Sequence, residues 1–414
     1  MIHGDNPTMR HIPFLLTLAI IVCALLASGC TGSGEAPAPA APEITMTVPV
    51  EPIPVMSSGG MNLAYELEFH PSGNETITPE KVEVIDPRTG AVLITLQGDD
   101  LDQLWHPASS PPPTQEEIDT FTSKMPMSRV SVWLVVNPES VPDRLIHRVT
   151  LNRNADGLPP AILEGGEVAV RKDCEPIVIA SPVRGPGWLI IETTYPYTHH
   201  FRAQITTNGA TRVPQRYAQD LIGADPETGR LASENITDIH SWYGYGKELY
   251  AVADATVAET LDGLPDIPTI YSTPPADITT AAGNYVILDL GDDKYACYGH
   301  MIPGSLTVKK GDTVKEGQVI GLVGNSGNSD VPHLHFQIVT GTPSFLGAEG
   351  YPHVYRSFES IGKADQALID TKTSQEDFSG LQFWEEYPDF IAWYETPIPR
   401  EAMLPDNHNV IRLS

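Results

Sequence analysis

The alternation of apolar and polar positions predicts short β-strands along most of the chain. In Met61–Phe69 every second residue is apolar, which is the period of a strand with one buried face. Similar runs occur at 82–96, 130–136 and 148–151. Short strands at this spacing predict a β-sandwich over residues 45–172, and the immunoglobulin-like fold is one form of such a sandwich.

A second β-rich region is predicted over residues 173–375, where tight glycine-containing turns separate the strand-like runs. The 38 prolines and 34 glycines of the chain favour short strands joined by turns over a helical bundle. Residues 376–414 are rich in aromatic side chains and are predicted to form a tail that packs back on a domain. The predicted fold class is therefore mostly β.

The N-terminus carries a predicted targeting signal. Phe14–Leu26 is an apolar run that is too short to span a bilayer, which takes ~20 residues. The run ends in small residues before Cys30 and resembles a lipoprotein cleavage box, although Ala27 stands where Leu is usual. We therefore predict a lipoprotein signal peptide over 1–30 and a flexible linker over 31–44. The protein is expected outside the cytoplasm with a lipid anchor in the membrane; a plain secretory signal is the alternative.

Composition narrows the possible partners. The chain has 53 Asp and Glu residues against 25 Lys and Arg residues, a formal net charge of −28. Such a surface repels phosphate backbones, which argues against a nucleic-acid-binding protein. Beyond the N-terminal segment only Cys174 and Cys297 remain, and they form either one disulfide or two free thiols.

Three histidines are candidates for metal chemistry. His333 and His335 are two residues apart, so on a strand both rings project from the same face. Neutral imidazole is a common zinc ligand. Two partly exposed histidines on an edge strand are the alternative interpretation of this pair. His300 lies upstream in the sequence Tyr298–Gly304.

Several motifs around these histidines occur in the same order as in a known protein family. Residues 245–340 closely resemble the lysostaphin-like zinc metallopeptidases, metallopeptidase family twenty-three. The motifs that match are Gly283–Ile287, Tyr298–His300, Val308–Gly327 and Pro332–Phe336.

This resemblance implies a lysostaphin-like β-sheet domain with a groove, the duplicated hybrid motif, and one zinc ion. It implies that His335 ligates the metal. It also implies that His300 and His333 are catalytic histidines that act on the water and on the oxyanion. Cell-wall cross-bridge peptides are the substrates that the resemblance implies.

The chain departs from this family at one position. The family has a His, three residues and an Asp, and both the His and the Asp are ligands. Asp220 matches the carboxylate ligand, but Arg216 stands at the place of the histidine, and a guanidinium cannot bind zinc. Gln215–Asp220 followed by Tyr243–Gly246 resembles one branch of the family, so Arg216 is a feature of that branch.

A nearby histidine is predicted to replace the missing ligand. Asn208-Gly209 predicts a two-residue hairpin, whose register places His199 on the same face as Asp220. His199 is therefore the predicted third ligand, and a slip of one residue presents His200 instead. His240, in a predicted loop, is a further candidate; two histidines at a groove rim without a role are the plain alternative.

The sequence thus predicts an extracytoplasmic zinc-dependent endopeptidase acting on cell-wall peptides. The alternative is an inactive lysostaphin-like module that binds cell wall or regulates another hydrolase. Arg216 favours this alternative, because the loss of one ligand weakens zinc binding.

Overall fold

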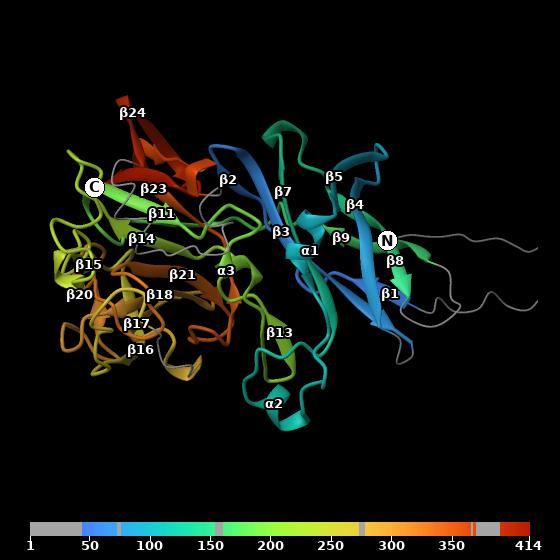
Figure 1. The fold of residues 1–414 in the computed structure, drawn as a ribbon, viewed down its shortest axis with the longest axis horizontal. Coiled ribbons are helices and arrows are strands. Elements are labelled where there is room, and N and C mark those ends of the chain that lie inside the picture. Colours follow the sequence, from blue (N-terminus) through green and yellow to red (C-terminus); the bar gives the residue numbers. More distant parts are fainter. Residues whose placement is uncertain (1–43, 73–75, 154–159, 273–277, 366, 370–389) are drawn as a thin grey trace, which may run out of the picture. The chain divides into compact units, whose positions relative to one another are not determined.

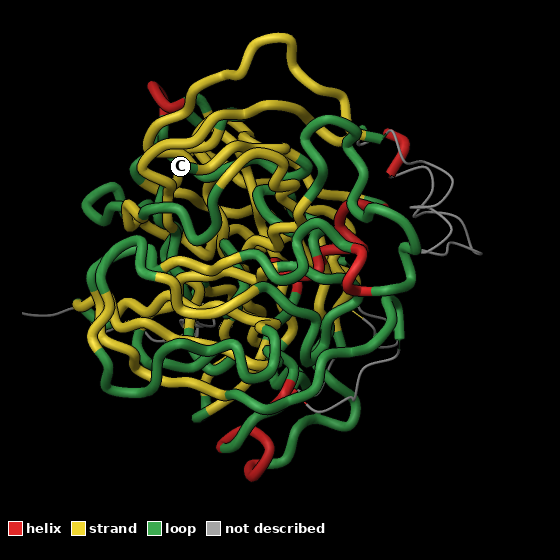
Figure 2. The backbone as a smooth tube through the Cα atoms, turned by 90° about the vertical axis from the view of Figure 1, so that its left-hand side faces the viewer, coloured by secondary structure: helices red, strands yellow, loops and turns green. Residues whose placement is uncertain are grey.

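Strands dominate the structure, a computed structural model, which confirms the mostly-β fold class (Figure 2). The structure describes residues 44–72, 76–153, 160–272, 278–365, 367–369 and 390–414. The predicted signal peptide with Cys30, nearly all of the predicted linker and the first part of the predicted tail lie outside the described residues. No helix in these described ranges has the length and apolar character that a bilayer crossing requires.

The first part of the described chain contains two antiparallel sheets. In one, β3 and β7 are central and the strand order is β1-β3-β7-β6, with β2 also on β3. The other has the order β5-β4-β8-β9. The strands are β1 (Ile44–Thr47), β2 (Val55–Ser57), β3 (Gly60–Pro71), β4 (Ile77–Asp86), β5 (Ala91–Gln97), β6 (Trp105–His106), β7 (Ser128–Val136), β8 (Arg144–Arg153) and β9 (Ala161–Ala169).

One hydrophobic core lies between these two sheets. Leu63 and Leu67 of β3 pack in it with Val82 of β4 and Val149 of β8, as the period-2 pattern requires. The short helices of this part are α1 (Asp99–Leu104), α2 (Gln115–Asp119) and the 3-10 helix η1 (Pro138–Ser140).

The opposite face of β3 is also buried, which the alternating pattern did not predict. Ala64 of β3 and Trp133 of β7 pack with Tyr217 and Val354 of the second part of the chain. The polar Glu66 on this face is only 1 % exposed.

The second part forms a 12-stranded sheet of the order β10-β23-β25-β11-β14-β21-β18-β17-β16-β19, with β22 on β21 and β24 on β23 (Figure 1). Its strands are β10 (Ile177–Ile179), β11 (Gly185–Ile191), β14 (Gln219–Gly223), β16 (Ala255–Leu261), β17 (Asn284–Gly291), β18 (Lys294–Met301), β19 (Thr313–Val314), β21 (Leu334–Thr340), β22 (Glu349–Gly350), β23 (His353–Ala364), β24 (Ile391–Met403) and β25 (Asn409–Leu413).

Smaller elements complete this part. Two further pairs of strands and several short helices lie between the described strands of the large sheet. They are β12 (Ile205–Thr207), β13 (Ala210–Arg212), β15 (Glu248–Tyr250), β20 (Val319–Leu322), α3 (His199–Arg202), η2 (Ile239–Ser241) and η3 (Ile278–Thr280).

The predicted C-terminal tail contributes strands to the large sheet. β25 lies between β11 and β23 and pairs with both, and β24 pairs with β23. The β-rich region therefore extends beyond the predicted boundary at residue 375. Both Cys174 and Cys297 are free thiols, and Cys297 is buried.

Candidate metal centre

The centre of the site is Asp220 on β14. Asp220 pairs with His335 of β21 on one side and with Ile191 of β11 on the other. Directly opposed residues of antiparallel strands share a face, and His335 Nδ1 lies 3.0 Å from Asp220 Oδ1.

Two more histidines reach this point, one from directly before β21 and one from β18. His333, two residues before His335, places Nε2 at 3.4 Å from Asp220 Oδ1. His300, the second-to-last residue of β18, has a left-handed φ of 58°, and its ring centroid lies 4.6 Å from that of His333. The predicted convergence of the His333 and His335 rings on one face is therefore what the structure shows.

The fourth histidine is His200, and its position corrects the hairpin argument. Thr207 pairs with Ala210 as predicted, but the pairing ends at Ile205 and Arg212. Residues 199–202 form the helical turn α3, capped by the Thr198 hydroxyl. Helical geometry therefore decides which ring faces inward, and His200 Nε2 lies 3.5 Å from Asp220 Oδ2.

His199 takes a different position from the one predicted. It is exposed on α3, and among the described residues it belongs to neither of the two groups with metal-ligand spacing. The predicted pairing of His199 with the strand of Asp220 is wrong because α3 replaces the strand there. His240 is likewise elsewhere, on the exposed η2, where its ring bonds Asp238 at 2.9 Å.

Each of the four rings has one nitrogen committed to an acceptor oxygen. A neutral imidazole that donates through one nitrogen presents a lone pair at the other. The bonds are His200 Nδ1 to Glu192 O (3.2 Å), His300 Nδ1 to Ser326 O (2.7 Å), His333 Nδ1 to Val331 O (2.7 Å) and His335 Nε2 to Gln337 Oε1 (2.8 Å).

Two of these acceptors are themselves fixed. The Gln337 amide donates to the Phe345 carbonyl at 2.7 Å, which orients the Gln337 oxygen toward His335. The Ser326 carbonyl lies in a loop where Gly327 has a φ of 79°. A Cβ on Gly327 would stand 2.3 Å from the Gly283 nitrogen, so only glycine fits there.

The electrostatics of the centre keep Asp220 charged. Burial alone would raise the pKa of Asp220, but the His200 and His333 rings outweigh it and hold that pKa well below its usual value. Burial lowers the pKa of His200 to about 3. Burial, with His333 and His335 nearby, holds the pKa of His300 well below its usual value.

These residues fit a zinc ion. His200, Asp220 and His335 each offer a ligand atom, and the three atoms lie within 4.8 Å of one another; His300, His333 and His335 do the same. The buried Asp220 Oδ1 has no hydrogen-bond partner in the described part of the chain, although two ring nitrogens face it. Two imidazoles and a carboxylate are a known ligand set for catalytic zinc.

The centre opens into a cleft of about 770 Å³, which is lined by Asp220 and by the four histidines around it. Most of the lining belongs to the second part of the chain. His106, Ser123 and Met125 of the first part line it as well. The sandwich region is therefore one wall of the cleft.

A comparison with known protein families finds a match for the segment that contains three of the five residues of the candidate metal centre. Residues 238–345 match Peptidase family M23. These residues belong to that family. The matched M23 segment contains His300, His333 and His335, and it begins after His200 and Asp220.

The curated relatives are similar over the same part of the chain. Peptidoglycan DD-endopeptidase ShyA of Vibrio cholerae is 34% identical over 119 residues, 28% of this chain and 23% of that protein. ShyB of the same organism is 30% identical over 132 residues, 31% of this chain and 26% of that protein. The chain thus spans about a quarter of the length of these relatives.

Solved structures include the catalytic domain of lysostaphin from Staphylococcus simulans. It is 24% identical and covers 29% of this chain and 84% of its own, with a TM-score of 0.19.

Arg216, the departure from the M23 ligand pattern, lies outside the metal centre. Its guanidinium is buried and makes a bidentate pair with Glu66 of β3, at 2.6 and 2.8 Å. It also donates to Glu349 at 2.7 and 3.1 Å. Burial alone would lower the pKa of Arg216, but Glu66 and Glu349 outweigh it and raise that pKa.

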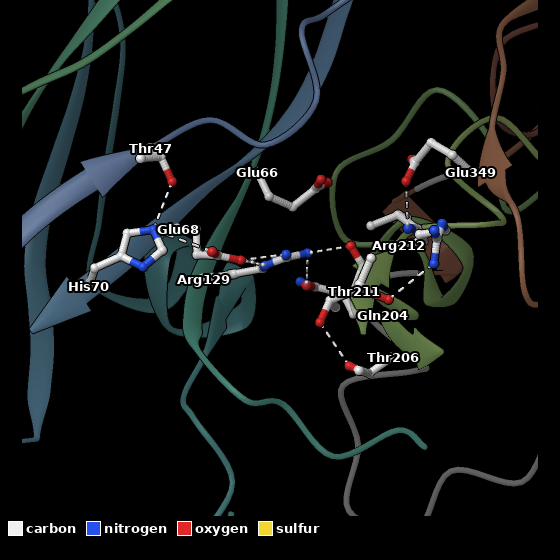
Figure 3. A network of polar contacts seen from close by, with 12 residues as sticks. Thr47, Glu66, Glu68, His70, Arg129, Gln204, Thr206, Thr211, Arg212 and Glu349 are labelled. Carbon is white, nitrogen blue, oxygen red and sulfur yellow. Dashed lines mark hydrogen bonds and ion pairs between the residues drawn. The ribbon is translucent and has the colours of Figure 1, made fainter. Parts of the chain in front are cut away.

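Arg216 thus links the sandwich to the second part of the chain and lies outside the candidate metal centre. A second arginine lies at the same contact, where Arg129 of β7 binds Glu68 and donates to the Thr211 carbonyl at 3.2 Å (Figure 3). In Figure 3 Glu66 lies near Arg129, and Glu349 lies near Arg212.

Gln337 and Glu192 were not identified from the sequence, and only Gln337 could have been found from a pattern in it. Gln337 is two positions after His335, so the strand period alone places both on one face. Glu192, whose carbonyl holds His200, has no such signal. Burial, together with the Asp220 carboxylate, raises the pKa of Glu192 to about 7.

Proposed function

We propose that this protein is an extracytoplasmic zinc-dependent endopeptidase that hydrolyses peptide bonds of cell-wall cross-bridges. The observation that carries the proposal is the group of His200, Asp220 and His335, whose ligand atoms lie within 4.8 Å of one another beside an M23 segment. The peptidoglycan DD-endopeptidases among the relatives support this substrate class.

In this proposal His200, Asp220 and His335 would hold a zinc ion, and three protein ligands are the number found in catalytic zinc sites. Zinc in such a site supplies Lewis acidity, which polarises a carbonyl and acidifies water. The cleft, which the second part of the chain and the sandwich both line, positions the peptide.

His300 and His333 perform the proton chemistry. The neutral His300 ring, with Nδ1 donating to Ser326, keeps Nε2 free to accept a proton. Burial would lower the pKa of His333, but the Asp220 carboxylate outweighs it and raises that pKa. His333 is thus the ring that more readily carries a proton and hydrogen-bonds a developing oxyanion.

The alternative, a non-enzymatic binding module, depended on a site with only two ligands. His200 supplies the third ligand atom in a position that the M23 pattern alone does not give. Arg216 is engaged with Glu66 and Glu349. Both observations support the enzyme over the module.

Zinc content and cleavage together test the proposal. We expect about one zinc per chain by mass spectrometry after dialysis against metal-free buffer. We also expect new amino termini when purified cross-linked muropeptides are incubated with the protein. Zinc-loaded protein that sediments with cell-wall sacculi but cleaves none of the muropeptides would support the binding module instead.

His300→Ala is expected to keep about one zinc per chain and to lose hydrolysis by roughly 10²–10⁴-fold, the range for a general acid–base residue. The reason is that His300 lies beside the three ligands and is not one of them. Metal content and initial rate are measured on the same sample. Loss of zinc from this variant would show that the division of roles is wrong.

The proposed location has its own test. We propose that Cys30 is lipidated and that the protein is a membrane lipoprotein facing outside the cytoplasm. The Cys30→Ala form is then expected in the soluble extracytoplasmic fraction, while the parent stays with the membranes. Equal membrane retention of both forms in a fractionation would remove the lipid anchor.

A further inference from the structure

Glu192 stands between the two parts of the proposed zinc site. It directly follows Ile191, the residue of β11 that pairs with Asp220. Its φ is 60°, in the left-handed region that is uncommon for residues other than glycine. Such conformations are found where the surrounding structure holds them in place, often at functional sites.

Two different groups of Glu192 bind His200. The His200 amide donates to the Glu192 carboxylate, Oε2, at 3.3 Å. The His200 ring donates through Nδ1 to the Glu192 main-chain carbonyl at 3.2 Å. One contact fixes the backbone of the histidine, and the other fixes the orientation and tautomer of its ring.

The helix that carries His200 needs such support. α3 has only four residues, and a helix of this length does not persist without tertiary contacts. The Thr198 cap binds the amide of Phe201, which leaves the His200 amide to Glu192.

We propose that Glu192 is a positioning residue that makes His200 a zinc ligand in a chain where residue 216 is Arg. In the family pattern the ligand histidine lies four residues before the ligand aspartate, so local chain geometry sets the distance between them. Here His200 lies 20 residues before Asp220, and Glu192 connects the two because it adjoins the strand partner of Asp220. The inference rests on the proposed zinc site.

Zinc affinity, measured by competition with a chromogenic chelator on the full chain, tests this role. Glu192→Ala is expected to weaken zinc binding by roughly 10–100-fold, because it removes the side-chain hydrogen bond that holds the His200 amide, while the main-chain carbonyl still accepts from the ring. Glu192→Gln is expected to bind zinc nearly as the parent does, because its amide oxygen still accepts the His200 amide. The exposed Glu227→Ala is the matched control and is expected to match the parent.

Two further measurements separate positioning from folding. Glu192→Gly removes the same carboxylate but favours a φ of 60°, so it is expected to fold and still lose affinity. With Co²⁺ in place of zinc, the visible absorption of the Ala and Gly variants is expected to change in intensity, which reports altered coordination.

The outcomes are distinct. If the parent binds zinc and the Ala and Gly variants bind it equally tightly, the positioning role is wrong and the proposed function stands. If the parent and all variants bind no zinc, the proposed function is wrong and this inference falls with it.

Discussion

His200→Ala is expected to lose its bound zinc and to reduce hydrolysis to background, whereas His199→Ala keeps both. Only Asp220 and His335 remain as ligands in the first variant, and a catalytic zinc site needs three. The loss of affinity is expected to exceed the ~100-fold upper range for outer partners of a ligand. Zinc per chain and the rate of muropeptide cleavage are measured on both variants.

The two histidines form a matched pair because they are adjacent on α3 and differ in direction. The His200 ring lies 4.6 Å from the His335 ring, centroid to centroid, while His199 is exposed. If His199→Ala loses zinc and His200→Ala retains it, the hairpin register predicted from the sequence is right in solution and the helical turn is not.

Arg216→Ala is expected to destabilise the protein by about 3–5 kcal/mol without lowering the zinc content of the folded chain. Removing the guanidinium leaves Glu66 and Glu349 buried without their cation, and breaking a buried pair on one side costs about this much. Denaturant unfolding followed by tryptophan fluorescence measures the free energy of unfolding. Metal analysis of the folded fraction measures the zinc.

Arg356→Ala is the control for this prediction. Arg356 also makes a bidentate pair, with Glu316 at 2.8 Å, but its side chain is 59% exposed. Exposed pairs contribute little to stability because water screens them, so this variant is expected to unfold almost as the parent does. A rise in zinc content in Arg216→Ala would contradict our interpretation, because it would mean that Arg216 obstructs the metal.

Local rules were sufficient for the part of the site that lies on strands. The two-residue spacing of His333 and His335 places both rings on one face where the chain is extended, and β21 begins directly after His333. The resemblance to the lysostaphin-like family, and not a local rule, implied that His300 and Asp220 meet these two histidines. The mostly-β class followed from local rules, from alternating runs and turn-forming residues.

The remaining features depend on contacts between distant parts of the chain. Whether His199 or His200 faces Asp220 depends on a four-residue helix, which is too short to leave a periodic pattern. Glu66 appeared as the solvent-facing side of a strand, yet it is buried because Arg216, 150 positions away, lies against it. Period and spacing determine which side chains share a face. Only the packing of one part against another decides what that face meets, and so the proposed third ligand and the contacts of Arg216 belong to the tertiary structure.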